Sequence, residues 1–215
     1  MSKSSKIFTV IGFIAFLGAA VLVNSIFFSD SNGLPKYRGD DVANAGNDPF
    51  LNKIPGDLRN KYENELVKLK KELKDNPGDT EKWIQVGIIK KVFNNYAGAR
   101  DAWEYAKIVN PNYSVAYFNL GDLYGSYLKD METAEKNYLK AIDIDPAVGQ
   151  YYVALAQFYK FFYTDKEDET DDILVRGLKE IPNDEGIKYQ LTRYWKQEGL
   201  SDQEINKRLA EIVQE

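Results

Sequence analysis

Hydrophobic, small and proline residues recur in one order three times along the middle of the chain, with a period of about 35 residues. Each copy has two amphipathic runs at helical spacing, and the second run ends at a proline. The copies consist of Trp83, Val86, Gly87, Ala99, Trp103, Ala106 and Pro111; of Tyr117, Leu120, Gly121, Tyr124, Ala134, Tyr138, Ala141 and Pro146; and of Tyr152, Leu155, Ala156, Tyr159, Leu174, Gly177 and Pro182. The pattern predicts first helices near 79–93, 113–127 and 148–162, and second helices near 97–109, 131–144 and 169–180.

Small and large residues alternate within each copy in a way that predicts close packing between the paired helices. The small ones are Gly87, Gly121 and Ala156, and the large ones that fill the space between helices are Trp103, Tyr138 and Leu174. Lys90 stands at a position that is aromatic in the other two copies. We expect its aliphatic stem, or the neighbouring Ile89 and Phe93, to fill that place.

The segments that flank the three copies each predict a terminal helix. Residues 57–78 carry one apolar stripe, formed by Leu58, Tyr62, Leu66, Leu69 and Leu73, and predict an N-terminal capping helix. The same stripe could instead pair with a second copy as a short coiled coil. Residues 183–215 predict a degenerate fourth unit and a C-terminal capping helix, in which Ser201 and Glu204 form a capping box.

The repeated residues resemble the tetratricopeptide repeat, a helix-turn-helix unit of about 34 residues. The resemblance covers 79–182 and implies an all-α fold, an α-solenoid whose units bury their apolar faces by stacking. It also implies a protein that binds a peptide or a partner surface in a concave groove lined by the first helices, and that is rarely an enzyme. Carried onto this sequence, the candidate groove residues are Ile84, Ile88, Lys91, Val115, Phe118, Asn119, Asp122, Val153, Gln157 and Lys160.

One subfamily with this repeat clamps the terminal carboxylate of a chaperone tail with Lys, Arg and Asn side chains. The corresponding positions here hold Ile84, Ile88, Asn119, Gln150 and Ala154, and only Asn119 fits that pattern. An apolar segment is therefore the expected ligand, oriented by Asp122 and Lys160. Alternatively, the apolar groove residues pack against a neighbouring repeat, a linker segment or the first helix.

The N-terminal region predicts a membrane anchor. Residues 7–28 contain no charged side chain, and 22 residues of helix span about 33 Å, enough for the core of a bilayer. The short basic tail at 1–6, with Lys3 and Lys6, favours a cytoplasmic N-terminus and a repeat domain on the extracytoplasmic side. Alternatives are a cleaved signal peptide, which would leave a secreted binding protein, and a cytosolic repeat domain tethered to an organelle.

Residues 29–56 contain many Gly, Pro, Asn and Asp residues without apolar periodicity, and they predict a flexible linker. Phe50, Leu51 and Ile54 are exceptions to this composition, and they could dock on the first helix. Between the anchor and the repeats, a flexible segment of this length would let the folded domain swivel near the membrane.

Composition narrows the functional classes. After Phe28 the chain holds 26 basic side chains, which are the 28 of the whole sequence without Lys3 and Lys6, against 33 acidic ones; this balance of −7 argues against a nucleic-acid partner. The chain has no His and no Cys, and no Gly-rich loop or nucleophile elbow, so we expect no enzyme, cofactor or metal site. The acidic turn at 164–172 lacks the spacing of a calcium loop and predicts a solvated turn.

Together these features predict a membrane-anchored scaffold that recruits a protein or peptide partner within a cell-envelope assembly or secretion complex. The main alternative is a structural subunit, a possible homo-oligomer, that assembles through the 57–78 helix or a repeat edge and binds no peptide. An unrecognised hydrolase is the third hypothesis and has the least support in the sequence.

Overall fold

The computed structural model describes residues 33–48 and 53–214, and these residues form helices joined by loops, without a β-strand. The basic tail at 1–6 and the predicted membrane helix at 7–28 lie outside this part of the chain. No helix within the described residues combines the length and the apolar character needed to cross a membrane.

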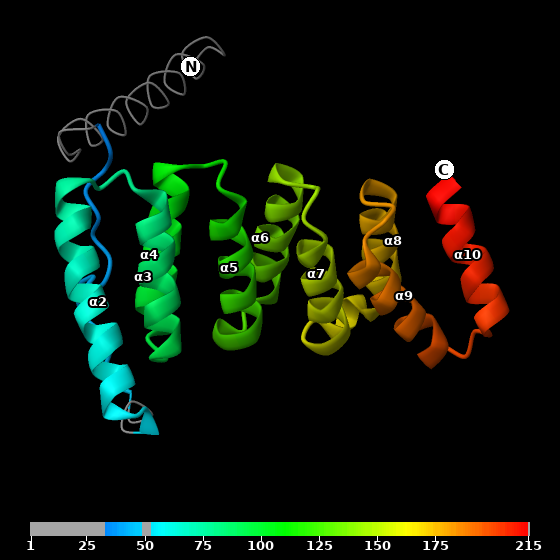
Figure 1. Ribbon diagram of the computed structural model, residues 1–215, viewed down its shortest axis with the longest axis horizontal. Helices are drawn as coiled ribbons and strands as arrows, with labels where there is room; N and C mark the ends of the chain where they lie inside the picture. Colours follow the sequence, from blue (N-terminus) through cyan, green and yellow to red (C-terminus); the bar gives the residue numbers. More distant parts are fainter. Residues whose placement is uncertain (1–32, 49–52, 215) are drawn as a thin grey trace, which may run out of the picture.

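The helices stand side by side in one row (Figure 1). In the first pair α3 (Thr80–Val92) packs against α4 (Tyr96–Val109). In the second, α5 (Ser114–Asp122) and its π-helical continuation η2 (Leu123–Leu128) pack against α6 (Met131–Ile144). In the third, α7 (Gly149–Phe161) packs against α8 (Thr170–Glu180), which follows the 3₁₀ segment η3 (Thr164–Glu169). The helix α2 (Gly56–Asp75) precedes these pairs, and α9 (Glu185–Gln197) and α10 (Asp202–Gln214) follow them. This all-helical row fits the predicted α-solenoid.

Short polar side chains and prolines set the ends of these helices. An Asp or Asn side chain at the N-cap accepts a hydrogen bond from a backbone N–H of the first turn in four of them: Asp79 in α3, Asn95 in α4, Asp130 in α6 and Asp184 in α9. The helices α4, α6 and α8 each end two residues before Pro111, Pro146 or Pro182, because the residue before a proline is disfavoured in helical conformation.

The small residues lie where paired helices approach most closely, as the repeat pattern predicts. A Cβ atom added to Gly87 would collide with the indole of Trp103, and one added to Gly121 would lie 2.8 Å from the ring of Tyr138. The indole N–H of Trp103 donates to the carbonyl oxygen of Ile84 at 3.1 Å, which holds the ring between α3 and α4. The buried apolar side chains form two clusters, one from the strap region through α5 and one from α6 through α10, and each extends over several neighbouring helices as a solenoid requires.

Residues 33–48, which we call the N-terminal strap, are ordered against the stack, so the prediction of a flexible linker is wrong for this part of 29–56. The ring of Tyr37 lies 4.6 Å from Trp83 and 5.3 Å from Tyr105, measured between ring centroids. Val42 and Ala45 are buried in the apolar core. The strap runs beside α2 (Figure 1), and its contacts with Trp83 and Tyr105 tie the start of the described chain to the first helix pair.

Lys90 explains why the strap docks. Its side chain is fully buried, and its Nζ donates to Asp40 Oδ2 at 2.6 Å, to the carbonyl oxygen of Asp41 at 2.7 Å and to that of Asn44 at 2.8 Å. All three acceptors belong to the strap. An unpaired buried ammonium is costly, so the lysine at the aromatic position of the first repeat requires the strap as its counterion and acceptor shell.

The carboxylate of Asp40 is held in its charged form by the same contacts. Burial disfavours this charge, but hydrogen bonds from Lys90, Asn44 and Asn95 outweigh burial and lower the pKa of Asp40 below its ordinary value. Nearby, Lys70 on α2 donates to both oxygens of Asp41 and lowers the pKa of that carboxyl too. The strap is therefore joined to two helices by ion pairs.

The C-terminal end of the row is closed by the predicted capping box. The hydroxyl of Ser201 accepts from the backbone N–H of Glu204 at 3.3 Å, and Glu204 Oε2 accepts from the backbone N–H of Ser201 at 2.9 Å. Ile205 on α10 is buried, and most of the exposed positions of the helix are polar. The last helix thus covers the apolar edge of the stack.

Candidate functional site

The helices α3, α5, α7 and α9 are the first helices of successive units, and we call the surface that they present the first-helix face. The ten candidate groove residues all belong to α3, α5 or α7. The structure places them in three local environments, one between α3 and α5, one between α5 and α7, and one between α7 and α9.

The part formed by α3 and α5 has an exposed apolar edge and an internal ion pair. Ile88 is 45% exposed, and Val92 beside it is 40% exposed. Lys91 Nζ lies 2.7 Å from Asp122 Oδ2, and Ser126 Oγ donates to the other oxygen of that carboxylate at 3.2 Å. Because both of its oxygens have partners within the chain, Asp122 already has a structural role and needs no ligand.

Ile84 does not lie on this face. Its side chain is only 6% exposed and belongs to the apolar core around Trp103. The repeat register assigns it to the groove, but the packing of the first pair covers it. For this residue the alternative of packing within the repeats is the correct one.

Between α5 and α7 the surface is hollowed over about 180 Å³, and Phe118, Gln150, Gln157 and Phe162 are among the residues that line the hollow. Phe118 packs on Tyr151, with ring centroids 4.9 Å apart, so only part of its ring is accessible. Val115 packs against the N-terminal apolar cluster. The amide nitrogen of Asn119 is buried and has no hydrogen-bond partner among the described residues. This hollow joins an aromatic floor to two glutamine amides.

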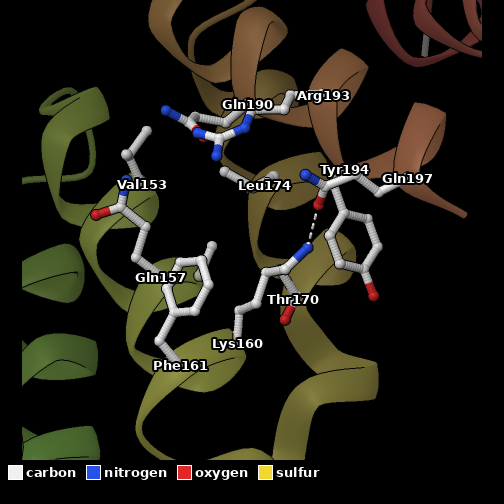
Figure 2. A pocket seen from close by; sticks show the side chains of 11 residues that line it. Val153, Gln157, Lys160, Phe161, Thr170, Leu174, Gln190, Arg193, Tyr194 and Gln197 are labelled. Carbon is white, nitrogen blue, oxygen red and sulfur yellow. Dashed lines mark hydrogen bonds between the residues drawn. The ribbon is translucent and has the colours of Figure 1, made fainter.

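The third environment is a small cavity of about 40 Å³ between α7, α8 and α9 (Figure 2). Three of the candidates, Val153, Gln157 and Lys160, line it from α7. Lys160 reaches from α7 toward α9, where its Nζ donates to Gln197 Oε1 at 2.5 Å and lies 4.6 Å from the ring centroid of Tyr194.

The remaining lining of this cavity comes from α8 and α9 and from the exposed end of α7. Leu174 forms its apolar base, and Arg193 extends over that residue (Figure 2). Phe161 is 61% exposed at its edge. Thr170 is buried, and its hydroxyl has no hydrogen-bond partner among the described residues. The cavity therefore combines an apolar base, amide groups and two cations.

Tyr194 adds a neutral polar group at the same place. Burial, with Asp171, Glu198 and other nearby carboxylates, raises the pKa of its phenol above the ordinary value. A phenol is protonated at neutral pH even at its ordinary pKa of 10, so this hydroxyl is able to donate a hydrogen bond.

The contribution of α9 was missed by sequence reasoning. Its surface residues Tyr189, Gln190, Arg193 and Gln197 stand in the register that Val153, Ala154, Gln157 and Phe161 occupy in the third repeat, 36 positions earlier. Lys188 replaces the expected aromatic in this unit, so the fourth copy was assigned only a capping role. Extending the register past Lys188 would have found these residues, among which Tyr189 is 63% exposed.

Comparison with known proteins supports the repeat. The sequence model of the tetratricopeptide repeat family matches residues 114–148, which span α5, η2, α6 and the loop before α7. No curated protein matches the chain. Tetratricopeptide repeats generally mediate contacts between proteins, so the matched repeat and the helical row suggest a protein-binding scaffold.

Proposed function

We propose that the protein is a non-catalytic, membrane-anchored scaffold that binds a segment of a partner protein on the first-helix face. The observation that carries the binding role is that four of the ten exposed large apolar side chains of the described residues lie on this face, at Ile88, Val92, Phe161 and Tyr189. Such side chains are the usual anchors of protein interfaces. The hollows beside them supply amide groups for the polar contacts of a bound segment.

The uncharged sequence at 7–28 supports the membrane part of the proposal. If the anchor ends at residue 28, only five residues separate it from Leu34, and the chain between the two positions spans at most about 20 Å. Since the strap is docked from there on, the first-helix face would be held close to the membrane rather than swivelling freely. This geometry suits a protein that receives its partner at a cell-envelope complex, with the repeats on the extracytoplasmic side.

The experiment compares matched substitutions on the two sides of the first helix pair. Ile88→Ser removes an isoleucine of the first-helix face, and Ile108→Ser removes one on α4 that is 50% exposed. Each variant is placed in the native host membrane, and co-purifying proteins are quantified by mass spectrometry against the wild type. We expect a specific partner to be lost in the double variant Ile88→Ser, Phe161→Ser. The same partner should be retained in Ile108→Ser.

Circular dichroism of each purified variant controls for folding. Because both isoleucines are about half exposed, neither substitution should alter the helical content. Retention of every partner by the folded Ile88→Ser, Phe161→Ser variant would refute the first-helix face as the binding surface.

A further inference from the structure

We propose that the outer face of α2 binds the membrane surface through anionic lipid headgroups, so that the row of helices extends away from the bilayer. The outer face is the exposed side of α2 opposite its buried leucines, and it is formed by Lys61, Asn64, Val67, Lys68, Lys71 and Lys74. The inference rests on the membrane anchor of the proposed function, and it adds which surface of the folded domain meets the lipid.

The helix α2 stands at one end of the row, and one of its sides is covered by the stack (Figure 1). Leu66, Leu69 and Leu73 are buried in the N-terminal apolar cluster, whereas Val67 is 59% exposed. Lys71 and Lys74 follow Val67 at intervals of four and three residues, so the three side chains share one side of the helix. An apolar side chain among lysines is the composition of helices that lie in a membrane interface.

The charge of this segment differs from that of the remaining chain. Residues 58–74 hold six basic side chains and three acidic ones, which leaves 20 basic and 30 acidic side chains in the rest of the chain after Phe28. The helix therefore carries a positive surface in an otherwise acidic protein, and an anionic surface complements it.

The lysines of the outer face are not all neutralised within the protein. The three carboxylates of 58–74 have partners, since Glu63 pairs with Arg59, Glu65 with Lys68 and Glu72 with Lys82. Among the described residues, the exposed Lys61, Lys71 and Lys74 form no ion pair. Asp75, exposed at the end of the helix, offsets one of these charges. A net positive charge remains available to lipid phosphates.

The docked strap brings this helix near the bilayer. Leu34 contacts the loop that follows α2, where its Cδ1 lies 3.7 Å from the place of a Cβ atom on Gly78. The chain from an anchor that ends at residue 28 to Leu34 spans at most about 20 Å. The tether thus starts beside the C-terminal end of α2, whose last five residues include Lys71 and Lys74. These two lysines are the part of the outer face that is nearest the membrane.

A second copy of the chain fits the outer face less well than lipid does. Pairing two outer faces would bring like charges together, and Val67 is the one large apolar side chain among the six residues of the face. A stable helix pair needs a continuous apolar seam, which in α2 is already buried against the stack. Position and charge therefore favour the membrane surface.

The test uses the full chain in lipid vesicles. Because the chain has no Cys, one introduced Cys carries one fluorophore, at Val67→Cys on the outer face or at Val213→Cys on α10, which is 42% exposed at the other end of the row (Figure 1). Quenching by nitroxide-labelled lipid headgroups reports contact with the membrane surface. In phosphatidylcholine vesicles with about one third phosphatidylglycerol, we expect the label at 67 to be quenched about twofold more than the label at 213.

The difference should largely disappear in vesicles of phosphatidylcholine alone and in the double variant Lys71→Gln, Lys74→Gln. The matched control is Lys136→Gln, Lys140→Gln, which removes two exposed lysines of α6 that form no ion pair among the described residues and should keep the difference. Equal quenching at 67 and 213 in the anionic vesicles, or a difference that survives the loss of Lys71 and Lys74, would overturn the inference.

Two further readouts separate the alternatives. Retention of the protein on vesicles after sodium carbonate extraction tests the anchor itself, so retained protein with equal quenching would refute this inference and leave the anchor standing. Release by carbonate would refute the anchor and this inference with it. Efficient formation of a disulfide-linked dimer by the unlabelled Val67→Cys variant in dilute vesicles would assign the outer face to a second copy, and would also overturn the inference.

Discussion

Removing the carboxylate of Asp40 should destabilise the protein more than removing the charge of its partner Lys90. In Asp40→Ala the ammonium of Lys90 stays fully buried and keeps only the carbonyl oxygens of Asp41 and Asn44. Breaking a buried ion pair from one side costs about 3 to 5 kcal/mol. The side chain of Asp40 is 27% exposed, and solvent screens the pair on that side, so we expect the low end, about 3 kcal/mol.

The reverse change, Lys90→Met, removes the buried charge itself and keeps most of its apolar stem. Asp40 then remains partly solvated and still accepts hydrogen bonds from Asn44 and Asn95, so the expected loss is about 1 kcal/mol or less. The prediction is therefore an asymmetry between two substitutions that break the same pair.

Thermal unfolding followed by far-ultraviolet circular dichroism measures this asymmetry. A loss of about 3 kcal/mol lowers the unfolding temperature of a chain of this size by roughly 6 to 12 °C. If Asp40→Ala unfolded within about 2 °C of the wild type, or if Lys90→Met were the more damaging change, Lys90 would not depend on the docked strap.

Two further predictions concern packing and pH. Gly121→Ala should lower the free energy of unfolding in urea by about 1 to 3 kcal/mol, because the added methyl group meets the ring of Tyr138 at 2.8 Å. The control Gly56→Ala, whose added methyl group has no neighbouring atom within 4 Å, should leave stability nearly unchanged. Equal effects of the two substitutions would argue against a close approach of the helices in the second pair. The lowered pKa of Asp40 means that its carboxylate stabilises the fold above the ordinary value of 3.8 and loses this effect as the pH falls through the lowered value. The stability difference between the wild type and Asp40→Asn should thus shrink as the pH falls from about 5 to 2, and a constant difference would contradict the ion pair.

The helix pairs could be predicted from the sequence because their determinants are local and periodic. Gly87 and Trp103 meet across one turn between adjacent helices, so the same steric solution recurs in the later copies at the same spacing. Prolines and N-cap residues set the helix ends within one turn of where they stand. Predicting the helix pairs and the helix ends therefore requires no information on contacts between residues far apart in the sequence.

The strap could not be predicted in the same way. Lys90 was recognisable as a misfit at an aromatic position, but its counterion is Asp40, which lies 50 residues earlier in a segment without periodicity. The strap docks through ion pairs, one tyrosine and two small apolar side chains, Val42 and Ala45, rather than through a hydrophobic stripe. A composition rich in Gly, Pro and Asn does not distinguish such a docked segment from a free one.

The candidate face was predicted in part. Register alone placed Ile88 and Lys160 on the first-helix face, where the structure has them, but it could not tell that Ile84 is covered by packing. It also stopped at the third repeat, because Lys188 breaks the pattern. The cavity with Thr170 and Arg193 depends on how α8 and α9 pack against α7, which no spacing within one repeat encodes.

The most direct test of the central claim is site-specific photocrosslinking of the full chain in its native host cells. A photoreactive amino acid is placed in turn at Ile88 and Phe161 on the first-helix face, and at Ile108 and Val67 as controls of similar exposure on α4 and α2. The account predicts that one discrete partner adduct forms from both positions of the face and from neither control. Adducts that form equally from all four positions, or only from Ile108 and Val67, would contradict it.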